Sequence, residues 1–389
     1  MYTNLTKYRR PLNGINEPKS DAAYWDIASE AFEKKKYKES IEAVLNYINP
    51  ELLRNVDTDN GNFEISQQHG SALINFRIKD NTLRIIVPFL RIDKAKKIPL
   101  MRKAAEINFH PLTLPQIILK DHFLLFFYST TLDLCQPNKI YDVLKEICLY
   151  ADSYDDEFIE KYNAAFYKKP KVTPLSSEEQ NAVWDHFQEI RSEYKNFLKY
   201  FEEKRWVGLQ FEIIIISIMS IANMPYVNGM LRSDLEEYMG NMFDGNIEFN
   251  YRLDKGRKFL NDFFSKVSRE TLFKDLYHAE KFISLKFRGT ADFLQREFEE
   301  HKNRIYEELS SSGSFSAAFS MQVLFLKVLY DYNLEEKHKT IIYNALEKAG
   351  GQDSDVAAKI LIDVFDRFLK GNIDNVKPAK KGFLAKLFG

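Results

Sequence analysis

The stretch ALINFRIKDNTLRIIVPF, residues 72–89, decides the fold of the first half of the chain. Apolar and polar side chains alternate on both sides of Asp80-Asn81, which is the pattern of two antiparallel strands joined by a tight turn. Residues 63–66 predict one strand before this hairpin, and residues 116–119 and 123–129 predict two strands after it. The first half is therefore expected to be an α+β domain with an antiparallel sheet.

Apolar residues at helical spacing surround these strands. They predict helices over residues 22–53, with a break near Lys34-Lys35-Lys36, and over residues 98–109, 138–151 and 155–165. Alternating strands have one apolar side, so we expect these helices to pack on one face of the sheet.

A segment with two prolines, Pro170 and Pro174, interrupts this pattern and predicts a linker over residues 168–176. Ser176 followed by Glu178 and Glu179 is typical of a helix start. Only helical periodicity follows, which predicts an all-α bundle of about seven helices. The predicted organisation is a flexible arm (1–20), the α+β domain (21–167), the linker (168–176), the all-α domain (177–371) and a basic and apolar tail (372–389).

Composition limits the function. The 389 residues include 31 Phe and 21 Tyr but only 15 Gly, and neither GxxxxGK[ST] nor GxGxxG occurs, which argues against a nucleotide phosphate loop. Net charge is -1, so we expect no nucleic-acid partner. Cys135 and Cys148 have neither disulfide nor zinc spacing, and Cys148 is expected in the core. No signal-length apolar run follows the basic N-terminus, which predicts a cytoplasmic protein.

Residues 207–227 approach the length of a membrane span. Gln210, Glu212 and Asn223 interrupt them, and a carboxylate is costly in hydrocarbon, so we expect a buried central helix and no membrane contact from it. Glu212 is expected at one edge of this helix, paired with an Arg or Lys. The alternative is an acid of raised pKa at a pocket.

One set of residues in the predicted bundle has metal-ligand spacing. Asp275-x-x-His278 and Glu335-x-x-His338, together with Glu212, resemble part of a carboxylate-bridged di-iron site. Such a site needs two Glu-x-x-His motifs, and only one is intact, in a charged run that predicts solvent exposure. We therefore assign no catalytic residue, no metal ligand and no cofactor.

Two segments are candidates for partner binding. Residues 91–103 hold six cations and one anion, and lack the interleaved aromatic residues on which bases stack, so an acidic protein segment is the expected ligand. The tail places an apolar tip after a basic spacer, which is typical of a short linear motif for a partner or a membrane surface. The predicted contact residues are Lys94, Lys96, Lys97, Arg102, Phe383, Leu384, Leu387 and Phe388.

The order of elements between Trp25 and Ala165 resembles the type III secretion chaperone-like fold, including the YbjN-type family. The resemblance rests on the hairpins 76–85 and 117–126 and on the helix containing Ile140, Val143, Leu144 and Ile147, and covers about 140 residues. It implies a non-catalytic protein that often dimerises and binds extended segments of other proteins, so a homodimer through this domain is an expectation.

The leading hypothesis is a non-enzymatic chaperone- or adaptor-like module that binds a partner polypeptide. A sheet edge would carry the contact by strand addition, with Phe76, Ile78, Ile85 and Phe89 as contact residues only if their face is exposed. Two alternatives stay open. The helical domain could be an enzyme or a cofactor- or metal-binding unit, or the tail could recruit the chain to a membrane or an assembly.

Overall fold

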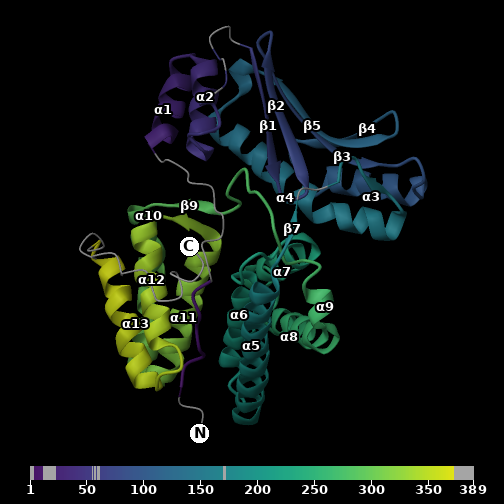
Figure 1. The fold of residues 1–389 in the computed structure, drawn as a ribbon. Helices are drawn as coiled ribbons and strands as arrows, with labels where there is room; N and C mark the ends of the chain where they lie inside the picture. The colour runs from purple at the N-terminus through teal and green to yellow at the C-terminus, as the bar shows by residue number, and fades with distance from the viewer. Residues whose placement is uncertain are drawn as a thin grey trace.

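The computed structural model describes residues 4–11, 23–54, 56, 58, 62–169 and 172–371. Figure 1 shows a sheet with its helices in one half of the molecule and a group of long helices in the other. This confirms the predicted fold class, an antiparallel sheet with helices followed by a largely helical region.

The sheet has the strand order β1-β2-β3-β5-β4, and all neighbouring strands are antiparallel. Asp80 and Asn81 both have positive φ, 50° and 58°, as a two-residue hairpin turn requires. The predicted hairpin is therefore confirmed. The strands are β1 (Phe63–His69), β2 (Ala72–Lys79), β3 (Thr82–Arg91), β4 (Gln116–Lys120), β5 (Phe123–Thr131) and the short β6 (Ala165–Phe166), which pairs with the end of β3.

Helices pack on one face of this sheet. α3 (Lys97–Phe109) contacts β4, and α4 (Pro137–Tyr162) contacts β2, β3 and β5. The hairpin of α1 (Ala23–Glu33) and α2 (Tyr37–Ile48) packs against α4. The strand residues that face these helices are buried, and they include all four conditional contact residues, Phe76, Ile78, Ile85 and Phe89. These four residues form the core, so the condition for their contact with a partner, an exposed face, is not met.

The prediction of two helices after β5 is also wrong, because α4 is one helix of 26 residues. Residues 151–162 contain no Pro or Gly that would end it. Polar side chains between the two predicted helices form hydrogen bonds within the continuous helix: the Ser153 hydroxyl donates to the Leu149 carbonyl (2.7 Å), and Asp152 accepts from the Ser71 N–H (2.6 Å).

The described part of the second half contains nine helices, more than the seven predicted. It also contains short strand pairs that helical periodicity did not reveal: β7 with β8, and β9 with β10. The helices are α5 (Ser177–Lys204), α6 (Val207–Ala222), α7 (Gly229–Phe243), α8 (Phe249–Lys266), α9 (Arg269–Leu272), α10 (Ala291–Glu307), α11 (Ser314–Asp331), α12 (Glu336–Ala349) and α13 (Ser354–Leu369). The strands are β7 (Thr173–Pro174), β8 (Tyr277–His278), β9 (Phe287–Gly289) and β10 (Tyr332–Leu334).

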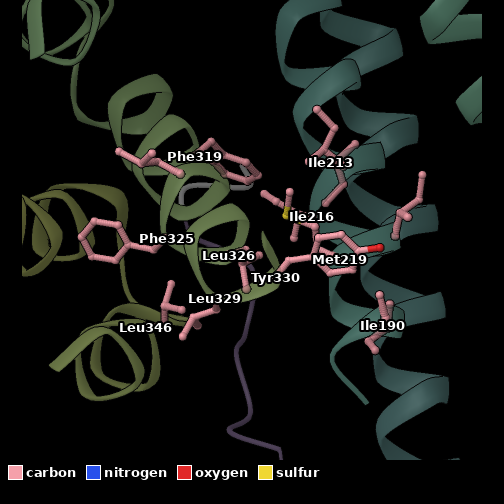
Figure 2. Packing of buried hydrophobic residues seen from close by; sticks show 14 of the residues in the cluster. Ile190, Ile213, Ile216, Met219, Phe319, Phe325, Leu326, Leu329, Tyr330 and Leu346 are labelled. Carbon is pink, nitrogen blue, oxygen red and sulfur yellow. The ribbon is translucent and has the colours of Figure 1, made fainter. Parts of the chain in front are cut away.

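α6 is the centre of the helical region. Its four consecutive isoleucines, residues 213–216, are all buried, as expected for a helix enclosed on nearly every side. α6 packs against α5 and α11, and Figure 2 shows Ile213, Ile216 and Met219 across from the residues of α11. Across the described ranges, no helix has both the length and the apolar content needed to cross a bilayer.

The two halves share part of their cores. The chain between α9 and α10 rises towards the sheet (Figure 1), and Phe282 and Ile283 from this segment are buried in the sheet-side core. Two hydrogen bonds join the halves: the Phe282 N–H donates to the side-chain Nδ1 of His69 (3.1 Å), and the Gly70 N–H donates to the Glu280 carbonyl (2.9 Å). The turn between β1 and β2 is thus fixed to the helical half.

The prediction of a flexible arm over residues 1–20 is wrong for residues 4–11. This segment runs between α5–α6 and α11–α12 (Figure 1), and Leu5 and Thr6 are buried. The Thr6 hydroxyl donates to Gln322 Oε1 (2.7 Å) on α11. Its partners lie at least 180 residues away, so the local sequence pattern could not indicate them.

Candidate functional site

α3 carries an unusual solvent-exposed face. Leu100, Ala104 and Ile107 are buried on one side of the helix. On the opposite side, Ile98, Arg102 and Phe109 are spaced by four and seven residues, which places them on one stripe. Ile98 is 71% exposed and Phe109 is 92% exposed. The stripe thus has an exposed apolar side chain at each end of the helix and a cation between them, and the described chain covers neither apolar side chain.

The C-terminal end of α3 is fixed beside the edge strand β4. Asn108 Nδ2 donates to the Ile117 carbonyl (2.9 Å), and the Ile117 N–H donates to Asn108 Oδ1 (2.6 Å). This side chain occupies the outer edge of β4 at Ile117, where an added strand would bind, and so protects that edge. Leu114 and Leu119, which lie shortly before and within β4, are also exposed.

The four predicted cationic contact residues lie at the same helix. Lys94 and Lys96 are in the loop before α3, Lys97 begins it, and Arg102 lies on the exposed stripe. All four are exposed, and none forms an ion pair with an acidic residue of the described chain. We call Lys94, Lys96, Lys97, Ile98, Arg102, Phe109, Leu114 and Leu119 the α3 surface.

The backbone fixes the position of the loop lysines. The Lys96 N–H donates to the Tyr162 carbonyl (2.8 Å), and Asn163 Nδ2 donates to the Lys94 carbonyl (3.1 Å). The first turn of α3 contains no acidic residue, so these cations lie at the positive end of the helix dipole. Such an arrangement is electrostatically unfavourable in the isolated chain, and an acidic group from a partner would relieve it.

The open face of the sheet is a second apolar surface of this half. Ile86 lies directly opposite Phe127, and Pro88 lies opposite Leu125; all four are half-buried on the face away from α4. At one end of this face Arg77 lies opposite Arg84, and like charges in that position are unfavourable.

The predicted tail contacts Phe383, Leu384, Leu387 and Phe388 lie outside the described residues.

Glu212 has the pairing expected for a buried acid. Its Oε1 accepts from Arg304 (2.7 Å) and from the Ser320 hydroxyl (2.7 Å). Burial raises the pKa of its carboxyl to about 7, although Ser320 and Arg304 both lower the pKa. Oε2 is buried and has no hydrogen-bond partner in the described chain.

A groove of about 490 Å³ lies between α7, α8 and α9, and Glu212 is not among the residues that line it.

The residues of the considered di-iron arrangement do not converge. His278 lies 3.0 Å from Glu179. The predicted solvent exposure of the charged run is confirmed for residues 335–337 and is wrong for His338, which is fully buried. His338 shares the buried side of α12 with Ile341, Ile342 and Ala345, a helical spacing that the sequence does contain. In the ranges that the structure covers, no group of three or more His, Cys, Asp or Glu residues could hold a metal ion.

Cys135 and Cys148 are free and buried, and burial raises the pKa of the Cys135 thiol to about 12. The expected core position of Cys148 is confirmed.

The sequence indicated the cations of the α3 surface but not its exposed apolar residues Ile98 and Phe109. Both lie on the side of the helix opposite Leu100, Ala104 and Ile107, and two large apolar residues on the polar side of a helix are the signal that the sequence offered.

Comparison with known protein families, with curated proteins and with solved structures found no match to this chain.

Proposed function

We propose that this chain is a non-enzymatic protein-binding module and that its α3 surface binds an acidic, amphipathic segment of a partner protein. The observation that carries the proposal is the 92% exposure of Phe109 on the stripe that also holds Ile98 and Arg102. Burying a phenylalanine side chain contributes roughly 1.5–3 kcal/mol, so this stripe offers a partner a substantial apolar anchor.

The cations define the chemistry of the partner. Lys94, Lys96 and Lys97 lie at the N-terminal end of α3, Arg102 lies on the stripe between Ile98 and Phe109, and all four lack acidic partners in the described chain. A segment with apolar residues on one side and Asp or Glu beside them would cover Phe109 and neutralise the start of α3. A helix laid along α3 has this geometry, because its anchors repeat at the same spacing.

Strand addition, the mode first expected for this fold, has less support at β4, because Asn108 occupies the edge at Ile117. The other edge strand, β1, pairs with β2 alone among the described residues. The resemblance in element order to chaperone-like proteins supports a partner-binding role. The two free cysteines are compatible with the reducing cytoplasm that we propose as its compartment.

The test is affinity purification of the tagged full-length chain from its native cell, with mass spectrometry of co-purifying proteins and metal analysis of the same sample. Three variants accompany the wild type: Arg102→Glu with Phe109→Asp on the α3 surface, Phe127→Asp on the open sheet face, and Val356→Asp as an exposed control on α13.

The proposal predicts a stoichiometric partner that only the α3 variant loses. Loss with Phe127→Asp alone would move the site to the open sheet face and overturn the assignment of α3. Stoichiometric metal without a protein partner would contradict a non-enzymatic role.

A further inference from the structure

Residues 4–11, which we call the N-terminal segment, occupy a groove between two parts of the helical region. One wall is formed by α5 and α6, and the other by α11, α12 and the loop before α13. The segment is extended, and Asn4 forms a β-bridge with Asp353. Figure 2 shows this purple part of the chain passing close to α11.

The groove recognises both backbone and side chains. The Leu5 N–H donates to the Gln352 carbonyl (2.9 Å), and the Gly351 N–H donates to the Leu5 carbonyl (3.1 Å). Leu5 is 2% exposed and is the apolar anchor. The groove fits the chain closely at Gly350, where a Cβ atom would lie 2.7 Å from the Tyr8 nitrogen.

Acidic residues of the groove match the cations of the segment. Arg9 pairs with Glu189 on α5, and Arg10 pairs with Glu347 on α12 (3.0 Å). The Lys7 N–H donates to Glu193 Oε1 (3.0 Å). The Arg10 guanidinium also lies 5.0 Å from the centroid of the Tyr343 ring. These contacts select an extended segment with two consecutive cations after an apolar anchor.

The segment leaves part of the groove unsatisfied. A cavity of about 20 Å³ lies beside residues 6–9, with Asn223 and His186 in its lining. Asn223 is only 9% exposed, and its Nδ2 donor has no hydrogen-bond partner in the described chain. The buried Tyr8 hydroxyl also has none. Unpaired buried polar groups are unfavourable, so a ligand that supplies an acceptor to Asn223 would fit better than residues 4–11 do.

We infer that this groove is a binding site for an extended basic segment of a partner protein, and that the chain's own residues 4–11 occupy it until such a partner displaces them. The ligand carries an apolar residue, a Ser or Thr after it, and two cations at the positions of Arg9 and Arg10. This site is separate from the α3 surface and does not depend on the function proposed for it.

Competition with the tethered segment sets the expected affinities. A tethered ligand acts at an effective concentration in the millimolar range, so the intact chain should bind a free ligand weakly. Leu5→Asp places a carboxylate in the buried anchor position and should release the segment, because an unpaired buried charge is strongly unfavourable.

The experiment measures fluorescence anisotropy with a labelled peptide of residues 2–11. The full-length Leu5→Asp chain is expected to bind this peptide at least roughly tenfold more tightly than the wild-type chain does. Adding Glu347→Lys to that chain should weaken binding, and a peptide with Arg10→Glu should restore it. The control peptide carries Leu5→Asp. Circular dichroism and urea unfolding check each chain, and a Leu5→Ala, Thr6→Ala chain replaces Leu5→Asp if the latter does not fold.

A folded released chain that fails to bind the peptide at about 1 mM would overturn the inference, and so would binding that the Glu347 and Arg10 exchange leaves unchanged. A wild-type dimer that Leu5→Asp abolishes would place residues 4–11 of a second copy in the groove and overturn the assignment to a partner.

Discussion

Replacement of Glu212 by glutamine should make the stability of the helical region less dependent on pH. The Glu212 carboxyl is buried between α6, α10 and α11, and burial is the main cause that raises its pKa from 4.5 to about 7. Glutamine keeps an acceptor for Arg304 and Ser320 but cannot ionise.

The sign and magnitude follow from the two pKa values. The folded state binds the proton more tightly than the unfolded state, so this contribution is complete below about pH 4.5 and is lost as the pH rises through 7. Between pH 5 and pH 8 the wild type should lose about 2 to 3 kcal/mol of unfolding free energy that the Glu212→Gln chain does not lose.

Urea unfolding of both chains at half-unit steps from pH 5 to pH 8 measures this difference. Glu300→Gln is the matched control, because Glu300 is an exposed carboxylate one turn before Arg304 on α10. The control should follow the wild type. If the stability curves of wild type and Glu212→Gln run parallel across this range, burial does not govern the ionisation of Glu212, and the reasoning is refuted.

Three further predictions concern stability. Phe282→Ala should lower the unfolding free energy of the sheet half by about 3–5 kcal/mol, because the Phe282 ring fills the sheet-side core although the residue follows α9 in the sequence. A change below about 1 kcal/mol in urea unfolding would contradict this shared core. Gly256→Ala places a Cβ atom 2.8 Å from Ile214 and Met242 and should lower the unfolding free energy by about 1–3 kcal/mol, whereas Gly240→Ala, with open space around it, should stabilise α7 by about 0.5–1 kcal/mol. Equal shifts of Tm for the two variants in thermal unfolding would disprove the packing argument. Asp275→Asn should become more stable relative to wild type as the pH rises from about 4 to 7, because burial, followed by Asp156 and Asp234, raises the pKa of this carboxyl from 3.8 to about 7. A constant difference in unfolding free energy from pH 5 to pH 7 would count against it.

Local patterns were sufficient for the sheet. The alternation around Asp80-Asn81 and the apolar runs of the later strands depend on neighbours in sequence, and the structure contains these strands. The sequence predicts two helices, 138–151 and 155–165, where the structure has the single helix α4. Asp152 is in fact bound by the turn after β1, a contact between residues that lie 81 positions apart.

Long-range contacts also explain the errors at the N-terminal segment. Leu5 and Thr6 stand in a polar stretch with Pro11 nearby, and nothing local indicates a groove formed by α5, α11 and α12. For the α3 surface, charge density alone identified Lys94, Lys96, Lys97 and Arg102. The apolar half of that surface required the structure, because exposure of Ile98 and Phe109 depends on which elements leave α3 uncovered.

The most direct test of the proposed function is calorimetric titration of the purified partner into wild-type and Phe109→Ala chains, with Val356→Ala as the exposed control. An anchor at the centre of the contact predicts that Phe109→Ala weakens binding by roughly tenfold or more, while the control binds as the wild type does. Equal affinities of the wild-type and Phe109→Ala chains would contradict a partner site on α3.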